Sequence, residues 1–182
     1  MSFATTSISS LFFWKAHIEN VSLDHIIDEC EEILEWRCSV KTSRGKPIDW
    51  SKFTLNLAPL IKELPINAKL SLEEPWMNVY AKGDYQEIHH HSLEGAILSY
   101  CYFYRLPKDS GEFLFFNEHF KDYCTSGLAG VVDLGSLGIH EWNRPIVKEG
   151  DIIFFPSSLL HSVSKNRSND LRVTVSGNVR IQ

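Results

Sequence analysis

The sequence lacks the features of three common classes of protein. No apolar run approaches the roughly 20 residues that a membrane-spanning helix needs. Lys and Arg number 18 against 23 Asp and Glu, and the net charge of −5 argues against generic binding to nucleic acid or an anionic membrane, because both need a basic surface. The four cysteines form no Cys-x-x-Cys pair, which favours a reducing, cytoplasmic environment over a disulfide-rich secreted domain.

The composition is that of an ordinary folded domain. Apolar residues make up 43% of the 182 positions, which is enough for one sizeable core. No repeat, linker or low-complexity tract divides the chain, and no basic region precedes the short apolar piece at residues 11–14, so we expect no signal peptide. We predict a single domain over residues 1–182, with a helical part at 1–67 and a β-rich part at 68–182.

Two helices are predicted in the first third of the chain. Apolar residues recur at helical spacing over residues 23–37, with acidic residues between them, and Ser22 precedes them as a helix N-cap. A second helix is predicted over residues 52–63, where Pro59 indicates a break or a new start. Residues 38–51, between the two helices, are predicted to be a loop.

From about residue 68 the composition is typical of strands. Short β-type segments are separated by Gly, Asp and Pro turns, at residues 70–72, 76–80, 96–104, 112–116, 151–156 and 171–175, with Val163 between the last two. Residues 117–144 are the least regular part. Helices followed by seven or more short strands predict a mainly β, α+β protein, with the helices packed on an antiparallel sandwich or small barrel.

Three consecutive histidines follow the turn at Gly83 and Asp84. If they lie on a strand, His89 and His91 point to one face and His90 to the other. Two imidazoles on one face form part of a metal site. His161, shortly after the apolar strand that ends at Pro156, is the best candidate for a third ligand. Three imidazoles suit iron, zinc, copper or nickel, and they leave positions open for substrate and water.

Arg172 lies eleven positions after His161, between apolar residues of a predicted strand. If it points inward, it needs a buried anionic partner. A dicarboxylic acid would supply one, since a guanidinium can bind a carboxylate through two parallel hydrogen bonds. The alternatives are that Arg172 faces solvent or pairs with a structural acid such as Glu149.

These residues together resemble the Fe(II)- and 2-oxoglutarate-dependent oxygenases, whose fold is the double-stranded β-helix, or jelly roll. The resemblance covers roughly residues 76–178 and is strongest to the small prolyl-hydroxylase-like group of bacteria and their phages. In that group an H-x-[D/H] pair, a distal His and an Arg about ten residues beyond it carry the site. The matching motifs are Trp76-x-Asn78-x-Tyr80, Gly83-Asp84, His89-x-His91, Ser99-x-x-Tyr102-Phe103, Ser110-Gly111, Glu149-Gly150-Asp151, Phe155-Pro156, His161, and Arg172-x-Thr174 leading to Asn178.

The resemblance implies a role for each matching position. His89, His91 and His161 would ligate iron, and Arg172 would hold the distal carboxylate of 2-oxoglutarate. Further residues would help to hold this co-substrate or line its pocket: Tyr80, Asn78, Thr174, Phe103 and Cys101. Phe103 lies where many relatives place a Tyr, and so it has no hydroxyl to offer.

The implied activity is hydroxylation of an unidentified small-molecule or peptidyl substrate, with release of succinate and CO2. For a phage-encoded protein the expected location is the host cytoplasm. The chain departs from most of the superfamily at His91, where a carboxylate is usual, so that the ligand set carries no negative charge. Glu94 is a second candidate for this middle ligand.

Two other functions fit part of the pattern. Gly83 with His89-x-His91, and Gly150 with Pro156 and His161, resemble the two cupin motifs, which suit a metal-dependent dioxygenase or isomerase that does not use 2-oxoglutarate. A non-catalytic β-sandwich binding protein is the third possibility. Arg172 favours the oxygenase, because the cupin pattern does not require it.

The substrate and the oligomeric state are left open by the sequence. Loops usually supply substrate contacts on such folds, here residues 38–51 and 117–144. His119, His140, Trp142 and Asn143 lie in the second of these segments.

Overall fold

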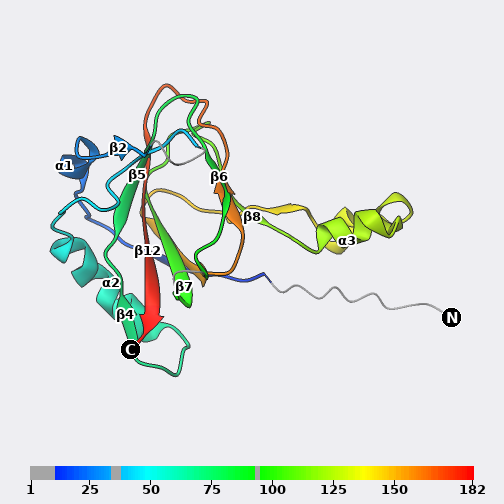
Figure 1. Cartoon of the computed structure of the whole chain (residues 1–182), viewed down its shortest axis with the longest axis horizontal. Helices are drawn as coiled ribbons and strands as arrows, with labels where there is room; N and C mark the ends of the chain where they lie inside the picture. Colours follow the sequence, from blue (N-terminus) through cyan, green and yellow to red (C-terminus); the bar gives the residue numbers. More distant parts are fainter. Residues whose placement is uncertain (1–10, 34–37, 93–94) are drawn as a thin grey trace.

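A computed structural model describes residues 11–33, 38–92 and 95–182, which form two antiparallel sheets that face each other, with helices on one outer face (Figure 1). The large sheet has the strand order β2 (Glu31–Glu32), β3 (Lys41–Thr42), β5 (Trp76–Tyr80), β12 (Arg172–Ile181), β7 (Leu98–Arg105), β10 (Asp151–Pro156) and β1 (Trp14–His17), and β4 (Leu70–Leu72) also pairs with β12. The small sheet has the order β6 (Gln86–His89), β11 (His161–Val163), β8 (Phe113–Phe116) and β9 (Trp142–Asn143). The predicted fold class is thus confirmed.

The alternation of side chains along the central strands separates two cores. On β12, Val173 and Val175 point to the helical side and pack with Phe53 and Leu57, while Arg172 and Thr174 point between the sheets. The second core, between the sheets, is built around aromatic residues of β7, β8 and β10, including Phe103, Phe113, Phe115 and Phe155. The candidate site shares this second space.

Helix α2 (Ser51–Glu63) covers the outer face of the large sheet and confirms the second predicted helix. Phe53, Leu57 and Ile61 are its buried face. The expected break at Pro59 is wrong, because the helix continues through this exposed residue, where only one backbone hydrogen bond is lost. The helix ends before Pro65, which favours an extended conformation at Leu64.

The first predicted helix is wrong over much of its length. Helix α1 spans only Asp24–Ile27, and β2 follows it at Glu31–Glu32; residues 34–37 lie outside the described part of the chain. Strand β2 pairs with β3, within the predicted loop, and this pairing overrides the helical periodicity. Ser22 is not the cap either: Leu23 takes the N-cap position, and its N–H donates to the hydroxyl of Tyr104, 3.1 Å away, on the neighbouring sheet.

The irregular segment at residues 117–144 holds short helices and projects from the sandwich near β8 (Figure 1). These are α3 (Phe120–Thr125) and two 3-10 helices, η2 (Leu128–Gly130) and η3 (Gly135–Leu137), and the segment returns to the small sheet through β9. None of these three helices buries a residue.

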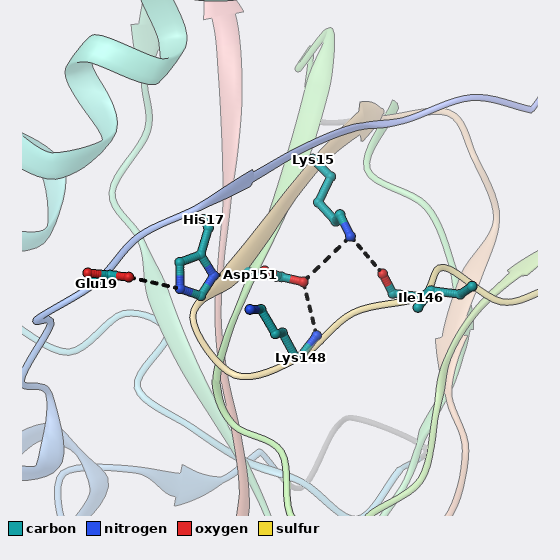
Figure 2. Close-up of polar contacts among 6 residues, drawn as sticks. All are labelled: Lys15, His17, Glu19, Ile146, Lys148 and Asp151. Carbon is teal, nitrogen blue, oxygen red and sulfur yellow. Dashed lines mark hydrogen bonds and ion pairs between the residues drawn. The ribbon is translucent and has the colours of Figure 1, made fainter.

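Strand β1 is attached to the edge of the large sheet by a buried carboxylate (Figure 2). Asp151 is 3% exposed and accepts hydrogen bonds from Nδ1 of His17 at 2.8 Å and from the backbone N–H of Lys148 at 3.0 Å. The ammonium of Lys15 lies 3.8 Å from the same carboxylate and donates to the carbonyl of Ile146. These contacts connect β1 to β10 and to the turn before it.

In the part of the chain that the structure describes, no helix has the length and apolar character needed to cross a membrane. The four cysteines, all within this part, are free thiols.

Candidate functional site

Three histidines converge between the two sheets. Each offers a ring nitrogen, and the ligand atoms of His89, His91 and His161 all lie within 4.8 Å of one another. His89 ends β6 and His161 begins β11, and the two are directly paired across these strands. His91 lies two residues beyond the end of β6, where its backbone N–H donates to the carbonyl of Ser157 at 2.8 Å. The predicted reason for the convergence of His89 and His91, alternation along one continuous strand, is therefore wrong. Their side chains nevertheless converge.

The Nδ1 atom of each of these histidines has an acceptor. His89 donates to the carbonyl of Glu87 at 2.9 Å, His161 to the carbonyl of Leu159 at 2.8 Å, and His91 to the amide oxygen of Asn178 at 2.8 Å. A histidine that donates from Nδ1 presents an unprotonated Nε2, which is the atom that binds a metal. The three rings are thus held in the tautomer that a metal site requires.

Burial keeps two of these rings neutral. Desolvation lowers the pKa of His161 well below its usual range and also lowers that of His89. For His161 the positive charge that His89 would carry lowers the pKa further. Because a protonated imidazole cannot ligate, this environment favours metal binding at neutral pH.

A cavity of about 210 Å³ opens beside the three histidines. Four of the predicted co-substrate residues line it, namely Asn78, Tyr80, Cys101 and Thr174. Burial raises the pKa of the Cys101 thiol to about 12, so it is a protonated wall residue rather than a reactive thiolate.

Arg172 lies next to this cavity but not on its surface. It pairs with Tyr80 across β5 and β12, and its guanidinium carbon is 6.0 Å from the Tyr80 ring and 5.8 Å from the Phe103 ring. Arg172 itself lines a neighbouring hollow of about 330 Å³ with Gly111 and Val147. Phe103, also predicted to line the pocket, is fully buried and does not line this cavity.

The guanidinium of Arg172 is buried with fewer hydrogen-bond acceptors around it than it has donors. The residue is 0% exposed and donates from one terminal nitrogen to the carbonyl of Gly111 at 2.7 Å. Its Nε and its other terminal nitrogen have no hydrogen-bond partner among the described residues. Desolvation by burial lowers the pKa of Arg172. The suggested structural acid Glu149 instead accepts a hydrogen bond from the backbone N–H of Leu106.

The structure adds residues that sequence reasoning did not assign. Trp76 stacks on His91 at 5.7 Å, and Arg44 lies 4.7 Å above the same indole ring, at the wall of the cavity. Phe113 stacks on His161 at 5.4 Å. Because Trp76 lies two and four residues before Asn78 and Tyr80, strand alternation could have found it.

Other predicted residues lie elsewhere. His90 is exposed and bonds to the hydroxyl of Ser92, although its side chain reaches the cavity wall. His119 is exposed beside Asp122. His140, Trp142 and Asn143 line a separate hollow of about 610 Å³, and Glu94 lies outside the described residues.

Comparison with known families decides between the candidate classes. A family model described as "Putative 2OG-Fe(II) oxygenase" matches residues 74–178, more than half of the chain. The chain belongs to this family. Membership excludes the cupin and the non-catalytic sandwich as interpretations of the His and Arg pattern, and it makes the protein an iron- and 2-oxoglutarate-dependent oxygenase.

Solved structures share the fold of this oxygenase. HygX from Streptomyces hygroscopicus, with nickel, 2-oxoglutarate and hygromycin B bound, has a TM-score of 0.63 at 10% identity, over 93% of this chain and 83% of that chain. The viral collagen prolyl hydroxylase vCPH from Paramecium Bursaria Chlorella virus-1 has a TM-score of 0.58 at 13% identity, over 93% and 96%. A prolyl-4-hydroxylase from Pseudomonas putida has a TM-score of 0.54 at 14% identity, over 85% and 78%. A search of curated proteins finds no match.

The residues present fit the two groups that the family uses. Three imidazoles with their Nδ1 atoms already occupied suit a divalent metal, and a buried guanidinium with two unpartnered nitrogens suits the carboxylate of 2-oxoglutarate.

Proposed function

We propose that this oxygenase hydroxylates a small-molecule or peptidyl substrate and releases succinate and CO2, with iron on His89, His91 and His161. The observation that carries the proposal is the fully buried Arg172, which has two unpartnered nitrogens next to the cavity beside these histidines. A buried, uncompensated cation of this kind is costly unless an anion joins it. The distal carboxylate of 2-oxoglutarate is that anion.

Bound Fe(II) and 2-oxoglutarate would supply the oxidative chemistry, in which O2 gives one oxygen atom to the keto acid as it is decarboxylated to succinate and the other to a C–H bond of the substrate. The chain supplies binding and orientation. Nε2 of each histidine faces the metal position, and Arg172 sets the depth at which the co-substrate lies. Tyr80, which pairs with Arg172 across the strands, and Thr174 line the cavity and would help to hold the co-substrate.

The aromatic residues around the site exclude water. Phe113 and Phe155 pack on His161 at 5.4 and 4.9 Å, and Trp76 covers His91. A dry pocket strengthens the attraction between Arg172 and a carboxylate, because the local dielectric constant is low. It also limits side reactions with water.

The substrate contacts are expected among the polar residues at the wall of the cavity of about 210 Å³ that the metal and the co-substrate do not use. Arg44, Glu87 and His90 stand at the cavity wall and are the candidate contacts. The solved structures of similar fold include HygX, with hygromycin B bound, and two prolyl hydroxylases. These relatives support two substrate classes for the proposal, a small molecule and a peptidyl group.

An Arg172→Ala variant tests the proposal. It should lose at least about 100-fold in affinity for 2-oxoglutarate, since a buried charge-assisted pair is worth about 3 kcal/mol or more, while the affinity for metal is kept. Isothermal titration of the Mn(II)-loaded protein with 2-oxoglutarate measures this. Arg105→Ala is the matched control, because Arg105 forms an exposed ion pair with Asp24 of α1 and does not line the cavity. Unchanged co-substrate affinity in Arg172→Ala would refute the role of Arg172.

A further inference from the structure

The three histidines differ in what holds their Nδ1 atoms. His89 and His161 donate to backbone carbonyls two residues before them, which come with the local chain. His91 donates instead to the side chain of Asn178, which lies 87 residues away on β12. The orientation of His91 therefore depends on a side chain from the opposite sheet.

Asn178 is held from several directions. It is 0% exposed, and its amide oxygen accepts from Nδ1 of His91 at 2.8 Å and from the hydroxyl of Ser99 at 3.0 Å. Its amide nitrogen donates to a carboxylate oxygen of Glu73 at 2.9 Å. Glu73 also donates its backbone N–H to the carbonyl of Asn178 at 3.0 Å, and its second carboxylate oxygen accepts from Nε of Arg180.

The charge of Glu73 determines which way the amide of Asn178 points. A carboxylate can only accept hydrogen bonds, so the amide nitrogen must face Glu73 and the amide oxygen must face His91. An oxygen that only accepts requires His91 to carry its proton on Nδ1. The unprotonated Nε2 of His91 is thus a consequence of the carboxylate at residue 73, transmitted through one amide group.

We propose that Asn178 and Glu73 are positioning residues that hold His91 in the tautomer and orientation in which Nε2 faces the metal. This inference rests on the proposed function, in which His91 is an iron ligand. Because His91 replaces the usual carboxylate, the three ligands bring no negative charge. The hydrogen bond from His91 to an amide held by Glu73 makes the ring a better electron donor, as such outer partners do for metal-bound histidines.

Trp76 completes the setting of His91. Its indole lies against one face of the imidazole with an interplanar angle of 21°, while Asn178 fixes the Nδ1 edge. The stack restrains the plane of the ring but does not choose between its two nitrogens. Asn178 and Glu73 act on this choice through the hydrogen bond at Nδ1.

The tautomer can be read in the metal-free protein by long-range proton–nitrogen NMR with 15N-labelled histidine, at a pH where the rings are neutral. Wild-type protein should show His91 as the Nδ1–H form. Asn178→Leu and Glu73→Gln should both give a mixture of forms, the second because the introduced side-chain amide can donate as well as accept and so lets Asn178 turn. His89 and His161 are internal controls and should not change.

Metal affinity is the second readout. Both variants should bind Co(II) about 10- to 100-fold more weakly than the wild type, the range found when an outer partner of a metal-bound histidine is removed. Glu74→Gln is the matched control, since it removes the charge of the adjacent acid and should change neither the tautomer nor the affinity. Glu73 is only partly buried, so Glu73→Gln keeps the test open if Asn178→Leu does not fold.

The outcomes separate the two proposals. Wild-type protein that binds no iron contradicts the proposed function. Wild-type protein that binds iron, with variants that keep the wild-type tautomer of His91 and the wild-type affinity for Co(II), contradicts the positioning role of Asn178 and Glu73.

Discussion

At the scale of single residues, His161 is the most enclosed of the three histidines that converge between the sheets. Phe113 and Phe155 pack on its ring, and its Nδ1 atom is held by the carbonyl of Leu159 at 2.8 Å. Such a ring loses little further freedom when it binds a metal. Removing the His161 ring should therefore lower the metal affinity more than removing a ligand that lies on a mobile loop.

We predict that His161→Ala lowers the affinity for Fe(II) by more than about 100-fold, because the loss of a direct ligand should exceed the roughly 10- to 100-fold effect of losing an outer partner. Anaerobic equilibrium dialysis with iron analysis measures the affinity. His119→Ala is the control, since His119 is 73% exposed and lies on the projecting segment. An affinity indistinguishable from that of the wild type in His161→Ala would exclude His161 as a ligand.

The site could be predicted from the sequence only in part, for a reason that single residues make clear. His89, His91, His161 and Arg172 stand out because their chemistry is unusual where they occur. The sequence does not single out Asn178 in this way, since an Asn near the end of a strand can have many different roles. Its role depends on the register between β4 and β12, which brings Glu73 beside it.

At the scale of elements, tertiary contacts decide where local patterns do not. Residues 28–33 have helical periodicity, yet Glu31–Glu32 pairs with β3 and adds to the large sheet. Pro59 predicts a break, yet α2 continues because Leu57 and Ile61 are anchored in the core on either side of it. The strands were easier to predict, since their apolar composition and turn residues agree with the final packing.

We predict that Pro59→Ala stabilises the protein by about 2–3 kcal/mol, because it restores the hydrogen bond to the carbonyl of Leu55 and removes the clash of the proline ring. Chemical denaturation measures the free energy of unfolding. Ala58→Gly, at the adjacent exposed position, should instead destabilise by about 1 kcal/mol. A lower stability of Pro59→Ala would mean that the ring makes contacts that outweigh the missing hydrogen bond.

The attachment of β1 should depend on pH through Asp151. Burial alone would raise the pKa of this carboxyl, but the hydrogen bonds from His17 and from the N–H of Lys148, together with the charge of Lys15, lower it overall. A lowered pKa in the folded state stabilises the protein above the unfolded-state pKa of about 3.9, and this contribution is lost as the pH falls through the folded value.

Asp151→Asn should therefore cost about 1–3 kcal/mol at pH 7, and the difference from the wild type should shrink below about pH 4. Denaturation at a series of pH values measures this. Glu19→Gln is the control in the same cluster, since Glu19 is 76% exposed and 3.9 Å from His17, and it should change stability by less than about 0.5 kcal/mol (Figure 2). Parallel curves for Asp151→Asn and the wild type from about pH 3 to 7 would contradict this role of Asp151.

At the scale of the whole molecule, the two sheets have separate tasks. The large sheet packs on the helices with one face and presents Tyr80, Thr174 and Arg172 with the other. The small sheet supplies His89 and His161. The space between the sheets is thus both an aromatic core and the candidate site. The general architecture could be predicted from composition. That Arg172 does not itself line the histidine cavity could not, since this depends on how Tyr80 and Phe103 pack beside its guanidinium. That residues 1–182 form one domain stays a prediction.

The central claim is that the three histidines and Arg172 together hold Fe(II) and 2-oxoglutarate. The most direct test is an anaerobic titration of the Fe(II)-loaded protein with 2-oxoglutarate, followed by visible absorption. We predict a saturable charge-transfer band, typical of a keto acid chelated to ferrous iron, in the wild type and in Arg105→Ala, and its absence at the same concentrations in Arg172→Ala and His161→Ala. A wild-type protein that binds iron but shows no band at saturating 2-oxoglutarate would contradict the claim.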